Sequence, residues 1–383
     1  MNKHLKIAII ADWMTNYGGA ESVISAFHDC FPDAPIYTTL YKPKAMRELG
    51  KLKNVKTSIL QKIPLVKHQW MLGQMTTAVE LFDLDEFDIV LSSCHSISKG
   101  VITNPETLHI SYCHTPMRYA WESWDLETRI KKFPKITHQY IRKQIDAIRK
   151  WDFSASQRVD RYIANSDYIA KKIEEHYHRK ADVIYPPVHA ERFKPAANPT
   201  EDYYLAVGRL IPYKKFDLIA ETFNKNGKKV KIVGTGPDLK KIQKMAGPSV
   251  EVLGAIENEA LAGLYANCKA LIFPQIEDAG IVPLEAMAAG RPVIALSQGG
   301  SLTSMKEGVT GIFFEKQTVQ SLNNAINRFE SMQFNPKEIR KHAEQFDITI
   351  FKQKIKGYVE KEWNEFQKNK SKLVILLLGD QVK

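Results

Sequence analysis

Two glutamates, Glu277 and Glu285, are separated by seven residues in a stretch whose pattern predicts a strand, a turn and a helix. The apolar segment 268–274 has the composition of a buried strand, Gly280 opens a turn, and residues 284–289 form helix readily. This order leaves backbone N–H groups unpaired at the helix start, where they can bind phosphate. We expect Glu277 before the turn and Glu285 about two helical turns into the helix. One carboxylate could then hold a sugar and the other the vicinal hydroxyls of a ribose.

Two cations follow another predicted strand, at residues 203–207. Arg209 and Lys214 stand at its carboxyl end, where parallel-sheet proteins bind ligands. A departing pyrophosphate gains negative charge as its bond to a sugar breaks, and cations at this position would stabilise it. The neighbouring Lys215 is expected in an ordinary solvated turn. The acidic segment 83–85 is expected at a solvated helix end, so no metal site is predicted and the two cations would act in place of a metal.

Three further candidates share one kind of position, directly after a predicted strand. They are His114 after residues 108–113, the pair Gly18 and Gly19 after residues 6–11, and the loop of Gly234 and Gly236 after residues 229–233. Glycine lets a loop approach a phosphate closely, but the first glycine turn lacks the spacing of a dinucleotide site. A lone histidine after a strand is more often structural than catalytic. By themselves these residues indicate a ligand-binding edge and no particular reaction.

Strands and helices alternate along the chain in a way that predicts two Rossmann-like α/β domains with parallel sheets. The predicted strands are residues 6–11, 88–92, 108–112, 161–164 and 182–185 in the first half, and 203–207, 229–233, 250–253, 270–273 and 292–295 in the second. Weak periodicity and two prolines between them indicate a linker. We expect an N-terminal domain at 1–188, a linker at 189–201, a C-terminal domain at 202–350, and a terminal helix and tail at 351–383 that packs back on the first domain. Ligands would bind in a cleft between the domains.

Length and composition fit a two-domain enzyme of a reducing compartment. A chain of 383 residues exceeds the usual size of one core, and 44% hydrophobic residues are typical of a globular protein. The four cysteines lack metal-binding spacing, which indicates buried thiols. The N-terminus has no pattern of a signal peptide, and the apolar run at 373–378 is too short to span a bilayer. We therefore expect a cytoplasmic protein, with peripheral binding to the inner face of the plasma membrane as a further expectation.

Residues 277–290, followed by 291–295 and a Gly-Gly pair at 299–300, resemble the signature of retaining glycosyltransferases of family 4, which have the GT-B fold. The resemblance implies catalytic roles for His114, Glu277, Arg209 and Lys214, and donor contacts for Gly18, Gly19, Gly234, Gly236, Gly280, Ile281, Val282 and Glu285. In this family the histidine touches the donor sugar, the first glutamate holds sugar hydroxyls, the second holds the ribose, and the cations face the diphosphate. Two positions depart from the family pattern. Ala279 stands where an aromatic residue is usual, and residues 301–304 lack the usual acid.

Residues 114–121 resemble a subgroup of bacterial mannosyltransferases that build O-antigen and other surface polysaccharides. This resemblance implies mannose transfer from GDP-mannose, without a cofactor, to a lipid-linked or oligosaccharide acceptor. Retention without an obvious nucleophile suggests front-face attack, in which the leaving phosphate takes the acceptor proton. A UDP- or dTDP-sugar donor is the alternative within the fold, and an epimerase would not explain the two glutamates. A different class of protein, one that keeps the fold without catalysis, would bind polyanions or membranes in a salt-sensitive way.

Two basic clusters stand out within the net charge of +11. Residues 42–70 carry eight Lys or Arg against one acid, and residues 129–150 carry eight against Asp146. Both fall in the domain that receives the acceptor in the resembled family, where a lipid-linked acceptor would bring anionic lipid near; each nearby cation would then contribute on the order of 1 kcal/mol. The Trp-Met-Leu run at 70–72 could add shallow apolar insertion. Two solvated helical faces are the alternative. We expect an anionic membrane surface as a partner, and no nucleic acid.

Overall fold

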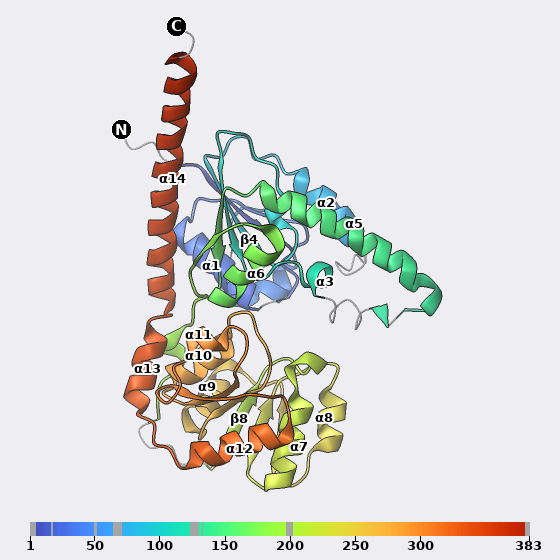
Figure 1. Ribbon diagram of the computed structural model, residues 1–383, viewed down its shortest axis with the longest axis vertical. Helices are drawn as coiled ribbons and strands as arrows, with labels where there is room; N and C mark the ends of the chain where they lie inside the picture. Colours follow the sequence, from blue (N-terminus) through green and yellow to red (C-terminus); the bar gives the residue numbers. More distant parts are fainter. Residues whose placement is uncertain are drawn as a thin grey trace. The chain divides into compact units, whose positions relative to one another are not determined.

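The chain folds into two α/β units in the computed structural model (Figure 1). The structure describes residues 5–16, 18–49, 52–63, 71–122, 130–131, 133–196 and 202–379. Unit 1 comprises Met1–Tyr185 and Phe351–Lys383, and unit 2 comprises Pro186–Ile350. Each unit is described below by itself.

Unit 1 is built on a parallel sheet of seven described strands. In spatial order they are β3 (Val55–Thr57), β2 (Ile36–Thr38), β1 (Ile7–Ala11), β4 (Ile89–Cys94), β5 (Leu108–Cys113), β6 (Arg161–Ala164) and β7 (Ala181–Val183). Every residue of β4 and β5 is buried, which is why these strands read as continuous runs rather than as an apolar and polar alternation. The helical segments are α1 (Gly19–Cys30), η1 (Pro43–Leu49), η2 (Ile59–Lys62), α2 (Leu72–Glu80), η4 (Ser98–Gly100), α3 (Arg118–Trp121), η5 (Lys135–Thr137), α5 (His138–Gln157) and α6 (Asp167–Tyr177).

Unit 2 has a parallel sheet of six described strands. Their order is β10 (Val250–Gly254), β9 (Val230–Val233), β8 (Tyr204–Val207), β11 (Leu271–Phe273), β12 (Val293–Leu296) and β13 (Gly311–Phe314). The helical segments are η6 (Ala190–Arg192), η7 (Pro212–Lys214), α7 (Phe216–Asn226), α8 (Leu239–Met245), α9 (Asn258–Asn267), α10 (Ile281–Ala288), α11 (Ser301–Ser304), α12 (Val319–Glu330) and α13 (Pro336–Glu344). Two clusters of buried apolar side chains form the core of this unit.

The strand orders create one switch point in each sheet, because consecutive strands run outward in opposite directions from a central pair. In unit 1 this pair is β1 and β4, and in unit 2 it is β8 and β11. Ligands of doubly wound proteins bind at the carboxyl ends of such a pair. The expected α/β fold with two Rossmann-like parallel sheets is therefore confirmed.

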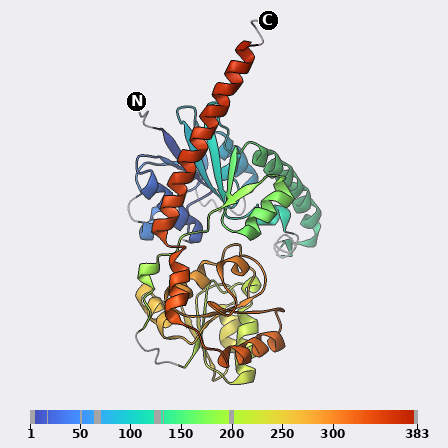
Figure 2. The same cartoon turned by 60° about the vertical axis from the view of Figure 1, so that its left-hand side comes forward.

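The long helix α14 (Ile348–Gly379) returns to unit 1 and lies along it (Figures 1 and 2). Phe351 stacks on Phe27 of α1 with ring centroids 6.2 Å apart, and Glu362 Oε2 lies 2.6 Å from Nε of Arg161 on β6. The expectation that the C-terminal helix packs on the first domain is thus confirmed. No helix among the described residues is long and apolar enough to cross a membrane.

The segment predicted as a linker, 189–201, contributes to the core of unit 2 in its first part. It contains η6, whose Ala190 is buried, and Phe193, which packs against Tyr265 with ring centroids 5.4 Å apart. Residues 197–201 lie outside the described part of the chain. Ser166 caps α6 by accepting the N–H of Ile169. The prediction that the four cysteines are buried thiols is confirmed.

Candidate active site

The switch point of unit 2 brings together two of the predicted catalytic residues. Lys214 closes η7 after β8, and Glu277 follows β11, the strand beside β8. Their side chains are mostly buried, at 14% and 18% exposure, and Lys214 Nζ lies 3.0 Å from Glu277 Oε1. This buried oxygen has no aligned hydrogen-bond donor among the described residues, so the contact is ionic. An ammonium group and a carboxylate thus face one another at the place where this fold binds ligands.

The backbone that carries Glu277 is fixed by the glycine pair after β12. Gly300 N–H donates to the carbonyl of Glu277 over 2.8 Å. Gly299 has φ +78°, and a Cβ on Gly300 would lie 2.3 Å from the carbonyl oxygen of Asp278. Only glycine permits this close approach of two loops. The Gly-Gly pair of the sequence signature therefore positions the glutamate loop.

The loop of Gly234 and Gly236 packs backbone to backbone against the segment that carries Arg209. A Cβ on Gly234 would lie 1.9 Å from the carbonyl oxygen of Gly208, and one on Gly236 would lie 2.3 Å from that of Leu210. Both glycines have positive φ, +142° and +156°. Their visible role is to let these loops meet, and a nucleotide contact remains a prediction. Arg209 is exposed and forms no ion pair with any residue in the described ranges.

Helix α10 starts directly after the glutamate loop, with Gly280 as its N-cap at φ +72°. No side chain caps the helix and its first turn carries no acid, so the N–H groups at Ile281 and Val282 face no competing carboxylate of their own helix. Donors left in this way suit an anion such as phosphate. The prediction that Glu285 lies two turns into the helix was wrong. The helix starts at Ile281, so Glu285 is its fifth residue and lies about one turn in.

Glu285 is held by a buried tyrosine. Its Oε2 accepts the hydroxyl of Tyr265 on α9 over 2.8 Å. Burial raises the pKa of Glu285 to about 7, against the opposing effects of the Tyr265 hydrogen bond and the charge of Arg192. The carboxylate therefore changes charge near neutral pH, which is unusual for a glutamate.

His114 lies at the corresponding edge of unit 1, at the end of β5. Its Nε2 is 2.8 Å from the hydroxyl of Ser93 on β4, and its carbonyl accepts the amide of Asn165. Burial lowers the pKa of His114 to about 3, with a contribution from the nearby His95. The ring is therefore neutral at physiological pH and can offer a hydrogen bond but no charge.

A buried acid at the end of β1 was not found from the sequence. Asp12 accepts the backbone N–H groups of Ile97 and Ser98 at 2.6 Å and that of His95 at 2.7 Å, and it also pairs with His95 Nδ1 at 2.8 Å. Burial alone would raise the pKa of Asp12, but the charge and hydrogen bonds of His95 outweigh it and hold that pKa well below its usual range. The same pairing raises the pKa of His95 against its burial. Asp12 and His95 could have been predicted from their positions, because each directly follows a buried strand.

The predicted glycine turn lies beside this pair. Gly18 is the N-cap of α1 and Gly19 is its first residue. The carboxylate of Glu21 is buried in the first turn, and a Cβ on Gly18 would lie 3.3 Å from Glu21 Oε2. Burial raises the pKa of Glu21. The start of α1 thus already faces a carboxyl group, and contact of Gly18 and Gly19 with phosphate remains a prediction.

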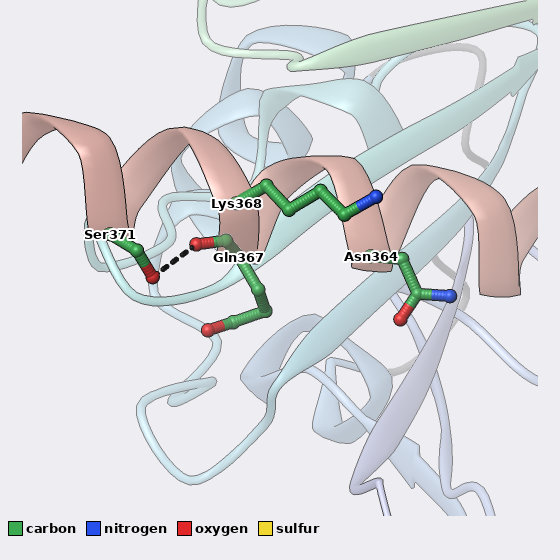
Figure 3. Close-up of a pocket in the computed structure, with 4 residues that line it drawn as sticks. All are labelled: Asn364, Gln367, Lys368 and Ser371. Carbon is green, nitrogen blue, oxygen red and sulfur yellow. Dashed lines mark hydrogen bonds between the residues drawn. The ribbon is translucent and has the colours of Figure 1, made fainter.

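Two observations concern the rest of the described chain. No group of three His, Cys, Asp or Glu residues with the geometry of a metal site occurs in the described part of the chain. A hollow on α14 is lined by Asn364, Gln367, Lys368 and Ser371, and its one internal bond runs from Ser371 Oγ to the Gln367 carbonyl (Figure 3). It is formed by side chains of a single helix and contains none of the predicted site residues.

Comparison with known proteins identifies the class. Residues 188–346 match the family described as glycosyl transferases group 1, and residues 17–192 match glycosyltransferase family 4. The chain folds like the Anabaena protein HepE solved with UDP and glucose (TM-score 0.69, 17% identity, 93% of this chain and 100% of that one). It also folds like the lipopolysaccharide outer core galactosyltransferase WaaB (TM-score 0.65, 16% identity, 94% and 100%).

The two family matches together span residues 17–346, and the protein belongs to the family 4 glycosyltransferases of GT-B fold. An uncharacterised glycosyltransferase of Methanocaldococcus jannaschii is 26% identical over 66% of this chain and 72% of its own length. The alpha-1,3/1,6-mannosyltransferase ALG2 of Dictyostelium discoideum is 23% identical over 73% and 77%. The resemblance of residues 277–290 to family 4 glycosyltransferases is thereby confirmed, and the mannosyltransferase subgroup remains a prediction.

Proposed function

We propose that this glycosyltransferase moves mannose from GDP-mannose to a lipid-linked or oligosaccharide acceptor, with retention of configuration and without a metal. The observation that carries the proposal is the Lys214–Glu277 pair, which lies at the β8 and β11 switch point, with the uncapped start of α10 four residues beyond Glu277. The resemblance of residues 114–121 and the similarity to mannosyltransferases named ALG2 support mannose.

The side chains have separate roles in this proposal. Glu277 holds hydroxyls of the donor sugar, and Glu285 accepts the ribose hydroxyls. Lys214 turns from Glu277 to the diphosphate as the donor binds, and Arg209 and the α10 N–H groups share the charge that the diphosphate gains. Neutral His114 donates or accepts one hydrogen bond at the donor sugar.

The proposed transfer needs no nucleophile from the protein. The acceptor oxygen attacks the anomeric carbon on the face from which the diphosphate leaves. The bond from that carbon to the phosphate oxygen breaks as the new glycosidic bond forms, and the leaving phosphate takes the acceptor proton.

A thermal-shift comparison of GDP, UDP, dTDP and ADP tests the donor. A ligand at a hundred times its dissociation constant adds about 2.7 kcal/mol of stability. We expect GDP to raise the melting temperature most. A larger shift with UDP would overturn the mannose assignment in favour of a UDP-sugar, the class of ligand present in the HepE complex with UDP-glucose. No shift with any nucleotide, together with tight and salt-sensitive binding of polyanions, would favour a non-catalytic protein instead.

A further inference from the structure

Helix α5 carries an exposed stripe that the packing of unit 1 does not explain. Ile136, Tyr140, Lys143, Ala147 and Lys150 recur at helical spacing from η5 into α5, and all five are exposed. We call these five residues the outer stripe. Ile136 is 91% exposed and Tyr140 66%, which is costly for apolar surface in water.

The other face of α5 accounts for its packing. Ile141, Ile145 and Ile148 are half-buried, and Asp152 and Ala155 further along are buried. Asp152 accepts the indole N–H of Trp121 at 2.7 Å and the hydroxyl of Tyr177 at 2.8 Å, which anchors the C-terminal end of the helix. Figure 1 shows the first turns of α5 extending away from the sheet of unit 1. The helix is thus held at its C-terminal end, and the outer stripe runs along it from Ile136 to Lys150.

The turn before α5 is ordered and adds a third apolar side chain. Thr137 donates its N–H and its hydroxyl to the Pro134 carbonyl, and the His138 ring bonds the Phe133 carbonyl at 2.9 Å. Phe133 is 41% exposed beside Ile136 in sequence. A turn closed by these hydrogen bonds before a helix keeps the exposed Ile136 and Tyr140 in place, and such prior ordering lowers the entropy cost of insertion.

Cations outnumber acids around these apolar residues. Between residues 131 and 150 the described cations are Lys131, Lys135, Arg142, Lys143, Arg149 and Lys150, and the one described acid, Asp146, lies 2.8 Å from Arg149. Lys143 and Lys150 of the outer stripe form no ion pair with a described residue. Aromatic and aliphatic side chains among lysines and arginines match the boundary of an anionic bilayer, where apolar groups enter the headgroup region and cations meet phosphate.

We propose that the outer stripe and Phe133 dock unit 1 on an anionic lipid bilayer, with Ile136, Tyr140 and Phe133 inserted and Lys143 and Lys150 on lipid phosphates. The proposal rests on the proposed function in one respect, since docking would bring the enzyme to a lipid-linked acceptor. It replaces the insertion predicted for residues 70–72. Met71 and Leu72 pack against the core of unit 1, and Trp70 lies outside the described residues.

Sedimentation with vesicles of phosphatidylcholine, with or without phosphatidylglycerol, tests the docking. The wild type should sediment with the anionic vesicles at low salt and be released at high salt, because screening shortens the reach of charge from about 10 Å at 0.1 M to about 3 Å at 1 M. Ile136→Ser with Tyr140→Ser should weaken binding roughly tenfold through lost apolar contact. Lys143→Glu with Lys150→Glu should weaken it at least about a hundredfold at low salt.

Matched controls test whether vesicle binding depends on the outer stripe itself or only on the loss of any exposed apolar or cationic side chain. Leu81→Ser removes an apolar side chain that is 73% exposed at the end of α2. The preceding residue, Glu80, contacts Trp151 and Arg158 at the C-terminal end of α5, away from Ile136 and Tyr140. Lys240→Glu with Lys244→Glu reverses two exposed cations of α8 in unit 2. Both controls should bind like the wild type, and all variants should keep its melting temperature. A wild type that ignores anionic vesicles at low salt, or stripe variants that bind like the controls, would overturn the proposal; the first result would favour a protein contact for this surface.

Turnover of a soluble acceptor analogue distinguishes the two proposals. Stripe variants that lose vesicles but keep turnover support docking alongside transferase activity. Wild-type protein that binds vesicles but transfers from no nucleotide sugar would sink the proposed function and leave the docking intact.

Discussion

The two sheets have the same kind of switch point, yet their edges offer opposite chemistry. In unit 2 the start of α10 is uncapped, and Lys214 is the cation beside Glu277. In unit 1 the corresponding edge is filled by the protein's own acids: Asp12 accepts the N–H groups of the loop after β4, and Glu21 lies at the start of α1. One topology thus gives one edge whose helix start faces no acid of its own helix, and one edge at which the protein's own carboxylates lie beside backbone N–H groups. The fold places a site, and side chains decide what it binds.

The largest effect on activity is expected from removing either member of the Lys214–Glu277 pair of unit 2. Lys214→Ala and Glu277→Ala should each lower turnover by about 2.7 to 4 kcal/mol in transition-state stabilisation, or a hundredfold to a thousandfold. The melting temperature should fall somewhat, because each variant leaves a mostly buried charge without its partner, so turnover is compared at a temperature at which both variants stay folded. The exposed pair Lys225 and Glu221 on α7 provides the control, because Lys225→Ala removes an ion pair of similar length, 2.9 Å, without touching the edge. Near-normal turnover in both site variants would show that the site is misassigned.

In unit 1 the same kind of substitution should act on stability instead. Asp12→Ala leaves several buried N–H groups without acceptors and should cost about 3 kcal/mol or more, measured by urea unfolding. The pKa of Asp12 is lowered on folding, so its contribution is present above the unfolded pKa and is lost as pH falls through the folded value. The difference between wild type and variant should therefore shrink in acid. A variant as stable as the wild type would mean that the carboxylate is not structural.

Glu285 should contribute less to stability than Asp12, and its contribution should depend on pH in the opposite direction. Folding raises its pKa to about 7, so its contribution to stability is complete below the unfolded value near 4.5 and is lost as pH rises through 7. Compared with Glu285→Gln, the wild type should lose on the order of 1 kcal/mol over this range, a figure discounted for partial exposure. Parallel pH profiles of the two proteins would contradict the raised pKa.

Removal of divalent metal ions is expected to have no effect on turnover. If Arg209 and Lys214 carry the charge of the leaving diphosphate, treatment with EDTA should leave turnover unchanged. Loss of activity that returns with added divalent cation would show that unit 2 uses a metal where the two cations are proposed to act.

Much of the fold can be predicted from local sequence, and the strands that were not predicted share one cause. Buried strands such as β4 and β5 are recognisable as apolar runs. The strands β2, β3 and β13 were missed, because three or four residues carry too little pattern and two of the three residues of β3 are exposed. Such strands are defined by the neighbour that they pair with, which a local pattern does not contain.

For the site, the sequence determined the residue types and the strand ends on which they stand, because composition and periodicity are local properties. Glu277, Lys214, His114 and Glu285 were chosen as candidates from these positions together with the resemblance to family 4, and their roles stay predictions. Only the tertiary structure decided that β8 lies beside β11, so that Lys214 meets Glu277, and that β1 lies beside β4, so that Asp12 meets His95. The same holds for the pKa of Glu285 and for the outer stripe of α5, since burial and exposure depend on which faces of distant segments cover one another.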